Sequence, residues 1–252
     1  MTLPRRLPRV VIALLTAAAL VTATLGASSA STALPLAGIV IALDPGHNGG
    51  NATHLAQINR RVWIGNRWKA CNTVGTTTRR GYPEHRFNFA VARRVKARLE
   101  ALGATVRLTR TNDIGWGPCI DARGKFGARV HAQLLLSIHG NGSAASHRGF
   151  FVMRPGLVRG YTDDILARSA TLAVAIRSGL VANGLPVANY YARRGIITRT
   201  DLGTFNMSDV PAVMVELGNM KNRTDAAWMS TPAGRDRYAA GLVSGIRLYL
   251  GR

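Results

Sequence analysis

Short apolar runs alternate with longer stretches of helical periodicity along most of the chain. Runs of four or five apolar residues predict buried strands at 39–43, 134–138, 150–153 and 212–215. Weaker patterns predict two more strands, at 105–109 and 196–198. Apolar residues spaced three and four apart predict helices over 84–102, 122–130, 162–182 and 231–250. This alternation indicates one α/β domain with a mixed, mostly parallel sheet flanked by helices.

One segment breaks the pattern. Residues 48–83 are rich in Asn, Gly, Thr and Arg and show no sustained period. We therefore predict a long loop here. Long loops inside a compact domain are usually functional or mobile.

The first thirty residues have the features of an export signal. Arg5, Arg6 and Arg9 precede an apolar stretch over 10–25, and small residues follow it. Cleavage after Ala30 or Ala33 would remove the signal 1–30 and leave a short linker at 31–37 before the domain at 38–252. The alternative is an uncleaved membrane anchor, but the apolar run contains threonines and is shorter than the span of about 20 residues that a membrane helix needs. We expect an exported protein with no stable membrane span, located in the periplasm or cell wall or secreted.

The chain is strongly basic, with a formal net charge of +21. Signal cleavage would remove only the three arginines named above. Such a charge predicts attraction to polyanions. The basic residues form no run longer than two and do not alternate with aromatic residues as in nucleic-acid binders. Together with the export signal, this favours anionic cell-wall polymers over nucleic acid as partners. Separately, we expect a monomeric protein.

The two cysteines, Cys71 and Cys119, are predicted to form a disulfide, because exported proteins fold in oxidising surroundings. The alternative is a pair of free thiols. A bridge between them closes a loop of nearly fifty residues, which would stabilise the fold by roughly 4 kcal/mol. Because the chain has no Cys-x-x-Cys spacing, a structural role is favoured over a catalytic one.

Four chemically active side chains occupy related positions. His47 and His139 each follow an apolar strand, Glu216 directly continues another, and Glu84 lies at the start of a predicted helix. Open α/β sheets carry their chemistry at the carboxyl ends of strands. Two histidines with a carboxylate are a known catalytic zinc set, and a second carboxylate can serve as general base. The spacing alone leaves open which glutamate is the ligand and which is the base.

Three of the other histidines, His54, His131 and His147, have no spacing that recommends them as ligands. The chain also has no Gly-x-Ser-x-Gly elbow and no phosphate-binding glycine fingerprint. These absences disfavour a serine hydrolase and a nucleotide-binding enzyme.

Five ordered segments carry a family resemblance. They are Ile41–His47, Glu84–Asn88, Leu99–Arg110, Leu136–Asn141 and Val210–Asn219. Together they resemble the zinc-dependent N-acetylmuramoyl-L-alanine amidases, in particular the single-domain exported enzymes of actinobacteria. The likeness extends from about residue 38 to the C-terminus.

The resemblance implies a specific division of roles. It makes His47, Glu84 and His139 the zinc ligands and Glu216 the general base that activates the attacking water. Asn88 and Arg110 match family positions that would support the site rather than react. The implied reaction is hydrolysis of the amide bond between N-acetylmuramic acid and L-alanine, in peptidoglycan or muramyl peptides, with Zn²⁺ as cofactor. The alternative is a cationic wall-binding protein without activity.

The chain departs from the family pattern at three places. The segment 51–83 is longer than in the simplest members, and Gly140 stands where alanine is common. Asn219-Met220-Lys221 replaces residues that are often more apolar. None of these differences removes a reactive group, but together they leave the substrate preference open.

Overall fold

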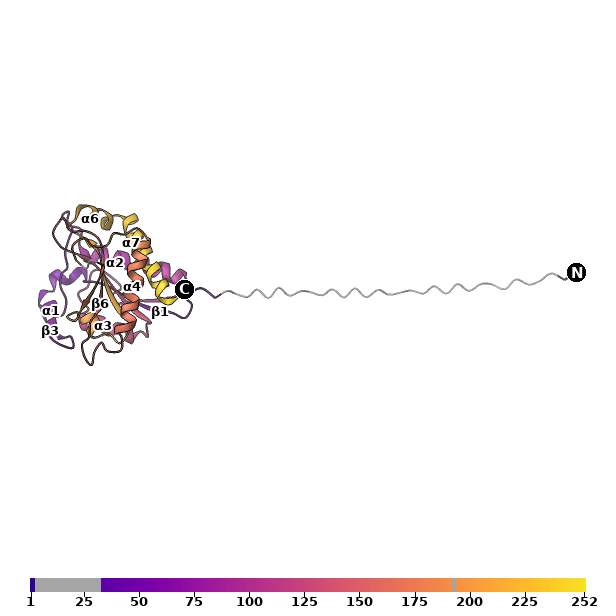
Figure 1. The fold of residues 1–252 in the computed structure, drawn as a ribbon, viewed down its shortest axis with the longest axis horizontal. Helices are drawn as coiled ribbons and strands as arrows, with labels where there is room; N and C mark the ends of the chain where they lie inside the picture. Colours follow the sequence, from indigo (N-terminus) through magenta and orange to yellow (C-terminus); the bar gives the residue numbers. More distant parts are fainter. Residues whose placement is uncertain (3–32, 192–193) are drawn as a thin grey trace. The chain divides into compact units, whose positions relative to one another are not determined.

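A six-stranded sheet forms the centre of the computed structural model, which describes residues 1–2, 33–191 and 194–252 (Figure 1). The predicted export signal and the first part of the predicted linker lie outside these residues, apart from the first two. Residues 33–252 form one compact unit. No helix in the described part of the chain is long and apolar enough to cross a membrane.

The sheet is mixed and mostly parallel, as the sequence predicts. Its strand order is β4-β1-β5-β8-β6-β7, and every neighbouring pair is parallel except β6 with β8. The strands are β1 (Val40–Pro45), β4 (Thr105–Leu108), β5 (Leu134–Asn141), β6 (Phe151–Pro155), β7 (Ile196–Arg199) and β8 (Ala212–Asn219).

Helices cover both faces of the sheet and bury its alternating side chains. One face packs on α2 (Glu84–Ala101), α4 (Leu166–Ala182) and α7 (Pro232–Leu250). The other face packs on α3 (Ile120–Arg129) and α5 (Gly203–Asn206). Leu134 and Leu136 face the first layer whereas Leu135 faces the second, because side chains alternate along a strand. Apolar runs of this kind are expected where both faces of a sheet are buried.

The prediction of a structureless loop over 48–83 was wrong in part. The segment contains a 3₁₀ turn, η1 (Gly49–Thr53), a short helix, α1 (Leu55–Asn59), and a hairpin of β2 (Arg61–Trp63) and β3 (Trp68–Ala70). Elements of three to five residues are too short to produce a recognisable hydrophobic period. Helix α6 (Arg223–Ser230) was also not predicted, although Asn222 caps it with two hydrogen bonds.

Candidate metal centre and active-site groove

The turn that follows β1 places His47 in an unusual backbone conformation. Its φ angle is 57°, in the left-handed region that non-glycine residues rarely adopt. Such conformations persist only where the surroundings hold them in place. Gly46, just before it, lies so close to His139 that an added Cβ would be 2.1 Å from the imidazole ring. The turn therefore packs one histidine-bearing segment directly against the other.

Three side chains from three separate elements converge at this point. His47 follows β1, Glu84 is the first residue of α2, and His139 lies on β5. Their candidate ligand atoms all lie within 4.8 Å of one another. Oε1 of Glu84 is 3.1 Å from Nε2 of His47 and 3.0 Å from Nδ1 of His139. These two separations are close to the edge of about 3.3 Å expected for a tetrahedron with bonds of about 2.0–2.1 Å, as in zinc sites.

The chemistry of this donor set also fits zinc. Two imidazoles and one carboxylate leave one tetrahedral position open, as in catalytic zinc sites. All three side chains are largely buried, with 11%, 6% and 13% of the side chain exposed for His47, Glu84 and His139. Burial opposes ionisation of Glu84, but the two histidines outweigh it and hold the pKa of Glu84 well below its usual range. The set therefore presents the anionic carboxylate that a metal requires.

Glu216 faces this cluster from the neighbouring strand. On β8 it is paired in register with His139 on β5. Its Oε2 atom is buried and has no hydrogen-bond partner among the described residues. Burial, and then the nearby charge of Glu84, raise the pKa of Glu216 well above its usual range. An unpartnered carboxylate of this kind is costly unless it has a ligand or a function.

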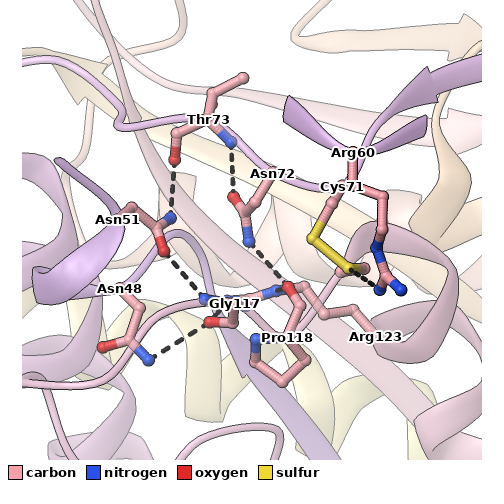
Figure 2. The surroundings of a disulfide bond; sticks show 10 residues. Asn48, Asn51, Arg60, Cys71, Asn72, Thr73, Gly117, Pro118 and Arg123 are labelled. Atoms are coloured by element: carbon pink, nitrogen blue, oxygen red, sulfur yellow. Dashed lines mark hydrogen bonds between the residues drawn. A yellow bond between two sulfur atoms is a disulfide. The ribbon is translucent and has the colours of Figure 1, made fainter. Parts of the chain in front are cut away.

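A loop held by the disulfide orients His47 from the other side. Nδ1 of His47 lies 3.0 Å from the carbonyl oxygen of Thr73, which also accepts a hydrogen bond of 2.8 Å from Asn51. Figure 2 shows this Thr73–Asn51 contact beside the bridge. The predicted Cys71–Cys119 disulfide is present, so the free-thiol alternative is excluded. Since a carbonyl can only accept, His47 donates through Nδ1 and turns Nε2 toward Glu84.

Beneath the turn lies a buried ion pair. The carboxylate of Asp44, at 1% exposure, accepts a hydrogen bond from the guanidinium of Arg123, which is also buried. Thr109 and Ser137 donate to the same carboxylate at 2.6 and 2.7 Å. Arg123 also donates to the carbonyl oxygen of His47 at 2.8 Å. The pair therefore supports the backbone of the candidate ligand.

Asn88 and Arg110 contact the same turn. Nδ2 of Asn88 donates to the carbonyl of Gly46 at 3.2 Å and to Oε1 of Glu84 at 3.3 Å. Arg110 donates to the carbonyl oxygens of Pro45 and Gly46 at 2.9 and 3.3 Å. Burial lowers the pKa of Arg110 to about 10, so the guanidinium is charged at neutral pH. Both side chains lie where they can hold the ligand-bearing backbone.

The four reactive side chains line one open groove of about 690 Å³. Cationic side chains also line it, from Lys69, Arg123, Arg199 and Lys221. His54, His131 and His147 are absent from its lining. His54 instead contacts the Gly50 carbonyl at 2.8 Å, and His147 stacks on Tyr190.

Comparison with known proteins identifies the family of the chain and agrees with its fold. Residues 41–247 match the Amidase_3 family model, described as N-acetylmuramoyl-L-alanine amidase. The chain is 40% identical over 227 residues to the N-acetylmuramoyl-L-alanine amidase Rv3717 of Mycobacterium tuberculosis, covering 88% of this chain and 91% of that protein. It is 27% identical to the probable cell wall amidase LytH of Staphylococcus aureus, covering 85% of this chain and 60% of LytH.

The fold is shared with a solved structure of similar size. The amidase Ami1 from Mycobacterium smegmatis superposes with a TM-score of 0.81 at 38% identity, covering 86% of this chain and 98% of that chain. The fold and the family model thus define an α/β peptidoglycan amidase. The chain belongs to the N-acetylmuramoyl-L-alanine amidase family.

Proposed function

We propose that this protein is a zinc-dependent hydrolase of the amide bond between N-acetylmuramic acid and L-alanine, acting on peptidoglycan or on muramyl peptides. The observation that carries the proposal is the convergence of two imidazoles and the Glu84 carboxylate beside the unpartnered Glu216. Family membership supports the same reaction.

His47, Glu84 and His139 are the proposed zinc ligands. When bound, zinc supplies Lewis-acid polarisation of the scissile carbonyl and of water. Thr73 fixes the tautomer of His47 through its carbonyl oxygen. Asn88 and Arg110 hold the turn that carries His47, so we assign them a positioning role.

Glu216 is the proposed general base. Its unpartnered oxygen can take the proton from the attacking water and then deliver it to the departing nitrogen of L-alanine. The peptide then leaves with a free amino terminus. A carboxylate held without a hydrogen-bond partner keeps its lone pairs available for this transfer.

The sequence and the relatives support a proposal for where the protein acts. We propose that residues 1–30 direct export and that the domain at 38–252 acts in the periplasm or cell wall or as a secreted monomer. The resemblance to a probable cell wall amidase supports this location. The basic surface would favour contact with anionic wall polymers.

The test is mass spectrometry of products from peptidoglycan and from muramyl dipeptide, with wild-type protein and with the Glu216→Ala variant. We expect only the wild type to release peptides with a free L-alanine amino terminus. The variant should bind zinc stoichiometrically, whereas His47→Ala should lose it.

Two results would contradict the proposal. Full activity of Glu216→Ala would remove the general-base role, and stoichiometric zinc in His47→Ala would remove that ligand. Saturable binding to cell walls by the zinc-loaded wild type, with no new amino termini, would support a non-catalytic wall-binding protein instead.

A further inference from the structure

A second cavity, of about 480 Å³, adjoins the active-site groove. Lys221 lines both, so the two hollows share a wall. The second cavity lies between the segment 78–80 and the residues that run from the end of β8 into α6. The second cavity therefore lies next to the groove, on the far side of Lys221.

The charged side chains that line the second cavity are all cationic. Four cationic side chains line it, namely Arg79, Arg80, Lys221 and Arg223, and no carboxylate does. None of these four side chains takes part in an ion pair or a side-chain hydrogen bond with the described residues. Scattered basic side chains on a convex surface are ordinarily just solvated. Here they surround a hollow from two separate segments, and four like charges at one hollow favour an anion.

One wall of the cavity is a tight turn. The backbone amides of Thr78 and Gly81 donate to the carbonyls of Tyr82 and Thr78, at 2.9 and 3.1 Å. The buried Thr78 hydroxyl also accepts from the Tyr82 amide at 3.0 Å. These bonds fix the backbone of Arg79 and Arg80 while their side chains stay exposed.

The other wall continues from the strand that carries Glu216. Asn219 accepts the backbone amide of Lys221 at 3.0 Å, which orders the chain just beyond β8. Asn222 then caps α6 and donates to the carbonyl of Ala145 at 2.8 Å. The positions of Lys221 and Arg223 are thereby tied to the catalytic strand.

We propose that the second cavity binds a carboxylate on the peptide part of the substrate during amide hydrolysis. This assignment rests on the proposed function of the groove. The N-acetylated sugars are uncharged, and the lactyl carboxyl of muramic acid is consumed in the scissile amide. The free carboxylates of such a substrate therefore all lie on its peptide, and the cavity adjoins the groove in which the amide bond would be cleaved.

The proposal is tested by kinetics on a matched pair of substrates. One is a muramyl tripeptide with free peptide carboxylates, and the other is the same compound with every carboxylate converted to a carboxamide. For Arg79→Gln/Arg80→Gln, we expect KM for the free acid to rise at least about tenfold with kcat unchanged, because charge-assisted hydrogen bonds are lost. KM for the carboxamide should not change. Arg223→Gln, on the opposite wall, should give the same pattern.

The control is Arg107→Gln/Arg168→Gln, which removes the same charge from exposed residues that line neither this cavity nor the groove. It should leave both KM values unchanged. If KM rises equally in the control and the test variant, the effect comes from long-range attraction between the basic protein and the substrate. That result would overturn the proposal. Unchanged KM for the free acid in the cavity variants would also overturn it.

Binding measured on the Glu216→Gln variant, which requires no turnover, separates this inference from the proposed function. Calorimetry should show that the free acid binds more tightly than the carboxamide, and that Arg79→Gln/Arg80→Gln removes the difference. If the wild type hydrolyses neither substrate, the proposed function is contradicted but the proposal for the second cavity is not. The free acid and the carboxamide could instead bind equally tightly, while binding of a glycerol-phosphate oligomer depends on Arg79 and Arg80. That result would assign the cavity to phosphate polymers and overturn the proposal.

Discussion

Gly46 has no room for a side chain, because the ring of His139 occupies the space where a Cβ would be. Replacement by alanine must move either the imidazole or the turn that carries His47. We expect Gly46→Ala to lower kcat/KM about 100-fold, since displacements of about 1 Å in an active site can have effects of that size. Zinc content and turnover of muramyl dipeptide would be measured together.

Gly115→Ala is the matched control for this variant. An added Cβ there meets neighbouring atoms only at 3.5 Å and beyond, which is ordinary contact, and its backbone is not in the left-handed region. It should keep near wild-type activity. Wild-type turnover by Gly46→Ala would show that the turn adapts and would contradict the packing argument.

Asp44 links the same turn to acid stability. Burial raises the pKa of Asp44, but Arg123 and the hydroxyls of Thr109 and Ser137 outweigh it and set the pKa below its usual value. The folded-state pKa is then lower than that of the unfolded chain, which is about 3.9. The contribution of this carboxylate to stability is complete above the unfolded value and is lost as pH falls through the folded value.

Asp44→Asn should therefore have two effects. At pH 7 it leaves Arg123 buried without its counter-charge and should lower the free energy of unfolding by about 3–5 kcal/mol. Below pH 4 the difference from wild type should shrink. Thermal unfolding from pH 7 to pH 2 would measure both effects, with Asp164→Asn on the exposed surface as the control. A constant difference at all pH values would contradict the linkage.

At the residue scale, the sequence points to the proposed reactive groups more readily than to the residues that hold them in place. His47, His139 and Glu216 are recognisable because each follows or continues an apolar strand. Thr73 was not predicted, because it acts through a backbone carbonyl, which any residue has. The Asp44–Arg123 pair joins residues far apart in sequence, and no local pattern signals such a contact.

At the scale of elements, prediction succeeded where a helix or strand buries a long periodic face. The six strands of the main sheet and helices α2, α3, α4 and α7 were all predicted, with shifts at their ends. The short elements within 48–83 and the helices α5 and α6 were not. Tertiary contacts hold these pieces, as where Asn206 donates to the Ile64 carbonyl at 2.9 Å. Their stability comes from partners elsewhere in the chain, so their own sequences carry little signal.

The contact between α4 and α7 gives a prediction at this scale. The two helices lie side by side (Figure 1), and a Cβ on Gly179 would be 2.3 Å from the backbone nitrogen of Gly245. Intrinsic helix propensity alone predicts that Gly179→Ala stabilises the protein by about 1 kcal/mol. The close approach predicts the opposite sign, a loss of about 1–3 kcal/mol from overpacking.

Denaturant unfolding of Gly179→Ala decides between the two signs. Ser178→Ala, one position earlier on the same helix and only half-buried, is the control and should change the free energy of unfolding by a few tenths of a kcal/mol. Hydrolytic activity should be unaffected in both variants, because neither residue lines the groove. A stabilised Gly179→Ala would show that the helices can separate without cost.

At the scale of the whole molecule, the proposed metal would cross-link three neighbouring elements that come from distant parts of the sequence. His47, Glu84 and His139 come from β1, α2 and β5, so an ion held by all three would connect two central strands to a flanking helix. These ligands exist as a set only in the folded chain. Zinc should therefore stabilise the folded state by mass action.

The expected effect is large enough to measure by calorimetry. Zinc at about 1,000 times its dissociation constant adds about 4 kcal/mol of stability. For a protein of this size that corresponds to a rise in Tm of roughly 8–16 °C. Wild type and Glu216→Gln should both show the rise when zinc is restored after chelation, because Glu216 is not a proposed ligand. His139→Ala should show none, whatever its own Tm, since the comparison is made within each variant. A full zinc-dependent rise in His139→Ala would mean that the stabilising ion is bound elsewhere. Loss of the rise in Glu216→Gln would instead make Glu216 a ligand, which would reassign the two glutamates that the sequence left undecided.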